Sequence, residues 1–307
     1  MKRVLVNDPI HEDALESLRR ELEVDAEHHD PAQLAETIDR YHAIIVRSAT
    51  RITREVITRG VRLEVIGRAG TGLDNIDLDA ARERGIVVLN TPGTNARSVA
   101  ELVFGQLLTL VRLISQATVT LKAGHWERHR LVGTELTGKT LGIMGIGRVG
   151  REVARLALGF EMQVLTHDKY IAPPDDLKDR VAATSFEQTL AESDCLSIHL
   201  PLSDETNGLI GAAAFARMKD GVLFVNTARG GIVDERALYQ ALCSGKVRGA
   251  ALDVYAVEPP THEIGRKLLE LENVIATPHI GASTYEAQRR VGMEVAERVR
   301  DALLKDR

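Results

Sequence analysis

The 307 residues carry a formal net charge of −5, and 44% of them are hydrophobic, 27% charged and only 4% aromatic. This composition is typical of a folded globular protein and excludes disordered, collagen-like and disulfide-framework chains. The acidic charge and the few aromatic side chains disfavour binding to nucleic acid or to an anionic membrane surface.

The first ninety residues alternate short β-branched runs with segments of helical period. Strands are expected at residues 3–6, 43–46, 63–66 and 86–89, and helices at residues 12–21, 32–40 and 78–84. Because parallel strands need a crossover connection, strict alternation of strand and helix predicts an α/β layer structure with a parallel sheet.

A long helix is expected next, from near Asn95 through Ile114, either bridging two domains or packing at a subunit interface. Six further strands are expected after it, at residues 141–144, 163–166, 195–199, 222–226, 250–254 and 274–276. A final amphipathic helix is expected over residues 285–304. Six strands in one series predict a doubly wound sheet of the Rossmann kind, and the length of the chain suggests about two domains.

Cys195 and Cys243 lie in apolar sequence without metal-ligand spacing, so we expect two core thiols, a reducing compartment and no metal site. The apolar run at the N-terminus is too short for a signal peptide, and the uncharged stretch 102–111 is too short to span a bilayer. We therefore expect a cytoplasmic protein.

Three glycines between an apolar strand and a helix form a candidate dinucleotide turn. Gly145, Gly147 and Gly150 match G-x-G-x-x-G, which permits a tight turn, a close approach to a pyrophosphate and helix packing. Asp168 ends the next strand, where a carboxylate accepts hydrogen bonds from ribose hydroxyls and repels a 2′-phosphate. The sequence thus predicts NAD; the alternatives are a glycine turn needed only for packing, and tolerance of NADP through His167.

Polar side chains follow three later strands, where ligands bind in doubly wound folds. Arg229 offers a planar fork for a carboxylate, and Glu258 is kept out of a helix by the two prolines after it. His279 follows the last strand and is a natural proton carrier near neutral pH. A lone residue of each type is often structural, as a helix-entry salt bridge or a buried histidine, but together they supply the cation and the base that hydride transfer needs beside a cofactor.

These residues stand in motifs that resemble the D-isomer-specific 2-hydroxyacid dehydrogenase family along nearly the whole chain. The motifs are the glycine turn with Asp168, the stretches 226–235 and 251–254, Glu258 with Pro259 and Pro260, and Pro278–Ala282. Within the family the likeness is greatest to members that oxidise 3-phospho-D-glycerate to 3-phosphohydroxypyruvate in serine biosynthesis, in the stretches 46–50, 67–77, 90–95 and 124–128.

The resemblance implies a role for each matching residue. Arg229, Glu258 and His279 would be catalytic, with Arg229 holding the substrate carboxylate, His279 acting as acid/base and Glu258 tuning it. The implied cofactor-binding residues are Thr71, Gly145, Gly147, Arg148, Val149, Gly150, Asp168, Leu200, Pro201, Thr227, Ala228, Arg229, Asp253, His279, Gly281 and Ala282. The implied substrate-binding residues are Arg47, Ser48, Arg68, Gly70, Arg128, Arg229 and His279, with Arg128 coming from a neighbouring subunit.

The resemblance also implies two doubly wound domains. A Rossmann NAD-binding domain of residues 93–282 would be inserted into a flavodoxin-like substrate-binding domain of residues 1–92 and 283–307, with catalysis in the cleft. A homodimer or homotetramer would form through the NAD-binding domains. The family members nearest in sequence often carry a C-terminal regulatory domain; because the chain ends at Arg307, we expect no serine inhibition through such a domain.

Two rival functions remain at this point. One is a glyoxylate or hydroxypyruvate reductase or another D-2-hydroxyacid dehydrogenase, which shares Arg229, Glu258 and His279 but does not need phosphate-binding arginines. The other is a NAD-sensing corepressor on the same scaffold, although no partner-binding tail is visible in the sequence.

Overall fold

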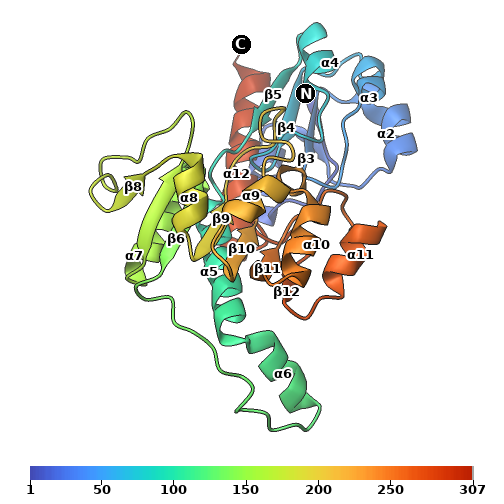
Figure 1. The fold of residues 1–307 in the computed structure, drawn as a ribbon. Helices are drawn as coiled ribbons and strands as arrows, with labels where there is room; N and C mark the ends of the chain where they lie inside the picture. The colour runs from blue at the N-terminus through green and yellow to red at the C-terminus, as the bar shows by residue number, and fades with distance from the viewer. Residues whose placement is uncertain (306–307) are drawn as a thin grey trace. The chain divides into compact units, whose positions relative to one another are not determined.

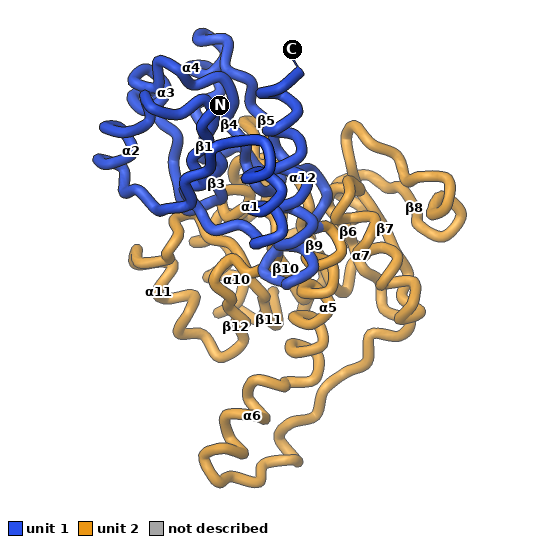
Figure 2. The backbone as a smooth tube through the Cα atoms, turned by 180° about the vertical axis from the view of Figure 1, so that it is seen from behind, with its two compact units in different colours: residues 1–95, 282–307 blue, residues 96–281 orange. Residues whose placement is uncertain are grey.

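The structure is a computed structural model that describes residues 1–305 (Figure 1). The chain forms two compact units, one of residues 1–95 together with the chain from Ala282 onward, and the other of Ala96–Gly281 (Figure 2). The expected boundaries, after residues 92 and 282, lie close to these.

Unit 1 is a parallel sheet of five strands with helices on both faces. Its strands are β1 (Arg3–Val6), β2 (Glu23–Asp25), β3 (Ala43–Val46), β4 (Val65–Arg68) and β5 (Val87–Asn90). Its helices are α1 (Glu12–Arg19), α2 (Pro31–Thr37), the 3₁₀ turn η1 (Ile38–Arg40), α3 (Arg54–Arg59), α4 (Leu78–Glu83) and α12 (Tyr285–Leu304). The strand order β2-β1-β3-β4-β5 is the flavodoxin-like order that the resemblance implied.

The apolar strand runs of unit 1 fill a core on each face of the sheet. Val4 packs against α1 and α12, whereas its neighbour Leu5 packs against α2, α3 and α4. Because successive strand side chains point to opposite faces, a strand covered on both sides is apolar at every position, as in β3.

Unit 2 is a parallel sheet of seven strands. These are β6 (Thr140–Met144), β7 (Gln163–His167), β8 (Val181–Ala183), β9 (Cys195–Ile198), β10 (Val222–Asn226), β11 (Val247–Leu252) and β12 (Val274–Ala276). The helices are α5 (Ala96–Arg112), α6 (Ile114–Lys122), α7 (Arg148–Gly159), α8 (Phe186–Glu192), α9 (Ala212–Arg217), α10 (Glu235–Cys243) and α11 (Glu263–Leu269), with the 3₁₀ turn η2 (Gly230–Ile232). The order β12-β11-β10-β9-β6-β7-β8 reverses between β6 and β9, which confirms the predicted doubly wound Rossmann sheet.

Two sequence-based expectations need correction. The long helix expected from near Asn95 through Ile114 is present as α5 but ends at Arg112, because Leu113 adopts a left-handed φ of 55°; α6 leaves α5 at an angle of 64°. Cys195 is buried, but Cys243 is exposed, because it ends α10 away from the stripe of Leu238 and Leu242 that faces the core. Within residues 1–305 no single helix is long and apolar enough to cross a membrane. Only α5 and α6 taken together, with the bend between them, have the length and apolar composition of a membrane span.

Candidate active site

The turn between β6 and α7 holds glycines for two different reasons. Gly145 has a φ of +98°, and a side-chain carbon there would lie 2.8 Å from the carbonyl oxygen of His199. A side-chain carbon at Gly150 would lie 2.0 Å from the Gly145 carbonyl oxygen, so packing within unit 2 demands both glycines. At Gly147 the same carbon would meet open space in front of α7, which no side chain of the described residues caps. Open space before the amides of a helix N-terminus, where Arg148 and Val149 begin α7, fits a diphosphate group.

Asp168 stands directly after β7 and links the glycine turn to the following loop. One carboxylate oxygen accepts the Ile146 amide at 3.0 Å, and the other accepts the amides of Tyr170 and Ile171 at 2.9 and 3.0 Å. A carboxylate has about four acceptor positions, so this one is fixed in place and still able to accept a ribose hydroxyl. The imidazole of His167 is engaged elsewhere, with Nδ1 3.1 Å from the Thr184 carbonyl oxygen.

The other residues assigned to the cofactor in unit 2 follow the carboxyl ends of β9 and β10. Leu200 and Pro201 come after His199, whose burial lowers its pKa to about 3 and keeps the imidazole neutral. Thr227 is buried, and among residues 1–305 its hydroxyl oxygen has no hydrogen-bond partner. A buried hydroxyl without a partner is costly, so this orphaned group fits a ligand contact at the end of β10.

Arg229 is presented by a turn that its own backbone and Asn226 stabilise. The Asn226 side chain donates to the Arg229 carbonyl oxygen at 3.0 Å and accepts the Ala228 amide at 3.0 Å. At Gly230 a side-chain carbon would lie 1.9 Å from the carbonyl carbon of Tyr255, so only glycine lets this turn pack against the loop after β11. The half-buried guanidinium donates to the Ala228 carbonyl oxygen at 2.7 Å.

His279 and Glu258 form a hydrogen-bonded pair beyond β12 and β11. His279 Nδ1 lies 2.8 Å from Glu258 Oε2, so Nε2 is the ring nitrogen that remains to exchange a proton with a ligand. His279 has a φ of +54°, an unusual conformation for a residue with a side chain, and such strain is often concentrated at functional sites. The pair has the geometry of a proton carrier held by a carboxylate.

The charge state of Glu258 follows from its surroundings. Burial favours the protonated carboxyl, but the hydrogen bond and charge of His279, the Tyr255 amide and the Arg229 guanidinium outweigh it, and the pKa of Glu258 is lowered. An ionised Glu258 can stabilise an imidazolium at His279. A cavity of about 210 Å³ adjoins the pair and is lined by Tyr255, Glu258, Pro259, Pro260, Pro278 and His279.

Asp253 fixes the backbone on the far side of His279. Its buried carboxylate accepts the Thr277 hydroxyl at 2.6 Å, the Ile280 amide at 2.8 Å and the Gly281 amide at 2.8 Å. The resemblance assigns Asp253 to the cofactor, and this clamp could not be predicted, because a sequence pattern does not show which donors surround a carboxylate. The strained His279 backbone is thus held between Thr277 and Ile280.

The residues assigned to substrate in the N-terminal part of the chain lie together within unit 1. Arg47 follows β3, and Arg68 ends β4 beside it, since Val46 pairs with Arg68. The loop from Arg47 to Thr50 is held by Asn75, whose amide donates to the carbonyl oxygens of Arg47 and Thr50 at 2.7 and 2.6 Å. Asp8, which is buried, accepts the Arg47 amide at 2.5 Å and the Thr50 hydroxyl at 2.7 Å. Two arginines beside a fixed loop are suited to an anion.

The other residues of unit 1 that the resemblance assigns to substrate or cofactor lie in the loops after β3 and β4, or at the point where the chain re-enters the unit. The exposed Ser48 belongs to the Arg47 loop. Gly70 has a φ of +150°, and a side-chain carbon there would overlap the Arg68 guanidinium at 1.4 Å from Nη1. Thr71 is exposed and donates to Asn95 at 3.4 Å, and Ala282 is the first residue of the returning chain.

Arg128 lies apart from the other assigned residues of unit 2. It is exposed on the segment after α6, which Figure 1 shows extending away from the sheet of unit 2. Helix α6 has no buried residue, and Val119, Leu121 and Trp126 are 68%, 56% and 78% exposed.

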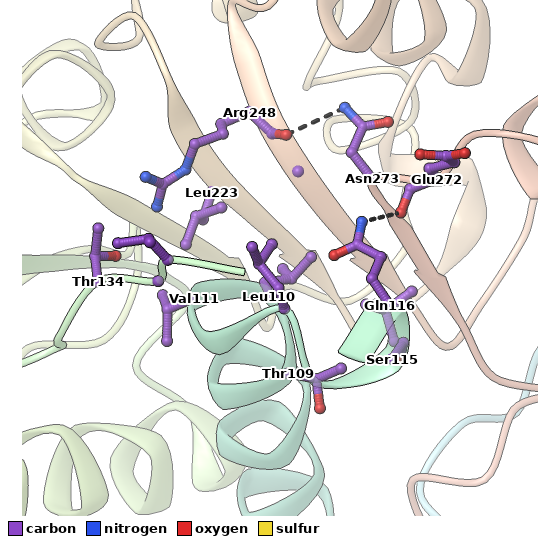
Figure 3. Close-up of a pocket in the computed structure, with 15 residues that line it drawn as sticks. Thr109, Leu110, Val111, Ser115, Gln116, Thr134, Leu223, Arg248, Glu272 and Asn273 are labelled. Atoms are coloured by element: carbon purple, nitrogen blue, oxygen red, sulfur yellow. Dashed lines mark hydrogen bonds between the residues drawn. The ribbon is translucent and has the colours of Figure 1, made fainter. Parts of the chain in front are cut away.

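A second cavity, of about 200 Å³, lies at the amino ends of strands in the unit 2 sheet (Figure 3). Leu223, Arg248 and Asn273, at or just before the amino ends of β10, β11 and β12, line it together with the end of α5. Ligands of doubly wound sheets bind at the carboxyl ends, so this cavity is not the candidate active site. Among residues 1–305 no group of His, Cys, Asp and Glu side chains is arranged to hold a metal ion.

Comparison with known proteins gives one consistent family. Residues 104–281 match the family model described as D-isomer specific 2-hydroxyacid dehydrogenase, NAD binding domain. The chain is 52% identical over 299 residues to hydroxypyruvate reductase of Thermotoga maritima, covering 97% of both chains. It is 48% identical over 297 residues to D-3-phosphoglycerate dehydrogenase of Archaeoglobus fulgidus, covering 96% of this chain but only 56% of that protein.

A solved structure agrees in fold over nearly the whole chain. D-lactate dehydrogenase of Aquifex aeolicus, in complex with NAD and lactic acid, superimposes with a TM-score of 0.88 at 32% identity, covering 99% of this chain and 96% of that chain.

Proposed function

The chain belongs to the D-isomer specific 2-hydroxyacid dehydrogenase family and is an NAD-dependent oxidoreductase, and we propose that it oxidises 3-phospho-D-glycerate to 3-phosphohydroxypyruvate. The observation that carries the chemistry is the hydrogen-bonded pair of His279 and Glu258 beside Arg229. We accordingly propose that the protein acts in serine biosynthesis and is located in the cytoplasm.

Each of the three side chains has one task in the proposed reaction. Arg229 binds the substrate carboxylate with its planar fork and polarises the forming carbonyl. His279 Nε2 accepts the proton of the C2 hydroxyl, and the ionised Glu258 stabilises the imidazolium that results. NAD, when bound, accepts the hydride from C2.

The phosphate group of the substrate is the feature that separates this proposal from its rival. A hydroxypyruvate reductase activity is favoured by the 52% identity with the Thermotoga maritima protein over 97% of both chains. The phosphorylated substrate is favoured by two arginines at the carboxyl ends of neighbouring strands: Arg47 follows β3 on a loop fixed by Asn75, and Arg68 ends β4. Two cations at neighbouring strand ends match a dianion better than a neutral hydroxymethyl group.

A substrate panel tests the choice between the two activities. With NAD and the purified protein, kcat/KM is expected to be at least 10-fold higher for 3-phospho-D-glycerate than for D-glycerate or D-lactate. Arg47→Ala is expected to raise KM for the phosphorylated substrate about 10- to 150-fold, the worth of a hydrogen bond to a charged group, and to leave D-glycerate unaffected. Arg82→Ala is the matched control, because Arg82 is an exposed arginine of unit 1 paired with Asp79. Equal turnover of D-glycerate would establish the rival activity.

Asp168 is proposed to select NAD over NADP. Asp168→Asn keeps the size of the side chain but removes the negative charge that repels a 2′-phosphate, and its nitrogen cannot accept the backbone amides that one carboxylate oxygen accepts in the wild type. We expect kcat/KM with NAD to fall by about 10-fold or more and that with NADP to rise, while KM for the hydroxy acid stays the same. An unchanged ratio between the two cofactors would assign the selection to another residue.

We also propose that a second copy of the chain covers α6. The helix has no buried residue; its Val119 and Leu121, and Trp126 on the segment after it, expose large apolar side chains. Burial in a homodimer would shield these side chains and carry Arg128, on the same segment, toward the partner's substrate. A tetramer that contains such dimers is also compatible with this proposal. A measured molar mass in solution equal to that of one chain would contradict homodimerisation.

A further inference from the structure

Glu235 is a buried carboxylate that neither the dinucleotide turn nor the catalytic pair explains. It is the first residue of α10, and it is only 8% exposed. It does not cap the helix, because Asp234 accepts the amides of Arg236 and Ala237. Burying a carboxylate is unfavourable unless it is paired, so its position calls for another explanation.

The partners of Glu235 lie on the loop that follows β11. Its Oε1 accepts the Ala256 amide at 2.7 Å. Its Oε2 lies 3.1 Å from His262 Nε2, but neither of these two atoms has a hydrogen-bond partner among residues 1–305. His262 is fixed separately, because its Nδ1 accepts the Gly265 amide at the start of α11. Glu235 therefore ties α10 to the loop through the Ala256 amide.

This loop presents the catalytic carboxylate. The Tyr255 amide donates to Glu258 Oε1 at 3.2 Å, while Glu258 Oε2 bonds His279. The Tyr255 hydroxyl lies 3.2 Å from the carbonyl oxygen of Thr277, two residues before His279. On its other side the loop packs on Gly230, beside Arg229. A shift of the Ala256 amide would move Glu258 relative to His279.

We propose that Glu235 is a positioning residue, which holds the loop through the Ala256 amide and so fixes Glu258 at hydrogen-bond distance from His279. The proposal rests on the proposed function only in that Glu258 and His279 are taken as the acid/base pair. Glu235 acts as an acceptor of the correct length; its negative charge is not what the loop requires.

Two substitutions of Glu235 separate the effect of side-chain length from the effect of negative charge. Glu235→Gln keeps the length and an acceptor oxygen but loses the charge, whereas Glu235→Asp keeps the charge and is one methylene too short to reach the Ala256 amide. We expect Glu235→Asp to lower kcat about 100-fold, the cost of a displacement of about 1 Å, and to shift the midpoint of the pH profile of kcat/KM. KM for NAD is expected to stay within twofold. Glu235→Gln is expected to keep kcat within about threefold of the wild type and to keep its pH profile.

Asp234→Ala is the matched control for lost stability. It removes the N-cap of the same helix without touching the loop, so it should lower the melting temperature and leave the pH profile unchanged. If Glu235→Asp behaves like this control, Glu235 only stabilises the fold and the proposal is wrong. If Glu235→Gln is the more damaged of the two, the charge matters and the acceptor role is wrong. Full activity of His279→Asn would instead overturn the proposed function, so the two failures are distinguishable.

Discussion

His279→Asn is expected to lower kcat by about 100- to 10,000-fold, the usual contribution of general acid/base catalysis. Asparagine tolerates the left-handed φ of +54° and can still donate to Glu258 Oε2, so the backbone and the loop should stay in place. It cannot accept a proton at neutral pH, so only proton transfer is lost. Steady-state kinetics with saturating NAD measure the effect.

The control for this variant is cofactor binding. The dissociation constant of NAD should stay within a few-fold of the wild type, since neither the glycine turn nor Asp168 is altered. A variant that retains more than a tenth of the wild-type kcat would remove His279 from the role of proton acceptor.

Glu258→Gln provides a pH-dependent check on the same pair. Because the folded-state pKa of Glu258 lies below its ordinary value of 4.5, the ionised carboxylate stabilises the protein above that pH. This contribution is lost as the pH falls through the folded-state pKa. The wild type should therefore be more stable than Glu258→Gln at neutral pH, with a difference in melting temperature that disappears in acid.

Arg229→Lys is expected to lower kcat/KM for the hydroxy acid by about 10- to 150-fold, the worth of a hydrogen bond to a charged group. Lysine keeps the positive charge but lacks the planar fork that binds a carboxylate through two parallel hydrogen bonds. We expect KM to rise and kcat to fall together, because the guanidinium both binds the substrate and stabilises the charge that forms on the carbonyl oxygen.

The fold should tolerate this substitution. Asn226 holds the turn through the backbone of residues 228 and 229, and those hydrogen bonds do not involve the arginine side chain. The melting temperature of Arg229→Lys should thus match that of the wild type. A kcat/KM equal to that of the wild type would show that a point charge suffices at this position.

Most of the fold could be predicted because buried parallel strands are continuous apolar runs. β3 and β10 are buried at every position and were predicted to the residue. The short edge strands β2 and β8 and the six-residue helix α3 were missed, because their residues are partly exposed and too few to show a period. The helix break at Leu113 carries no glycine or proline that would have signalled it.

The candidate site could be predicted by residue type and by its place at strand ends, but its supporting contacts could not. Arg229, Glu258 and His279 are polar residues where the fold puts ligands. Tyr255, Thr277 and Glu235 support them through hydrogen bonds between segments far apart in the chain. Such contacts depend on side-chain directions, which a single sequence does not contain.

The two ends of unit 2 meet. Ser98, two residues into the unit, donates its hydroxyl to the carbonyl oxygen of Gly281, the last residue of the unit, at 2.8 Å. Closing a loop as long as Ala96–Gly281 in a disordered chain costs about 5 kcal/mol of entropy. Once unit 2 is folded, the folding of unit 1 no longer carries that cost, because the folded unit 2 already holds the two chain segments of unit 1 together. Unit 2 thereby acts on unit 1 as a crosslink across a long loop does: it lowers the entropy of the unfolded state of unit 1, without a covalent bond.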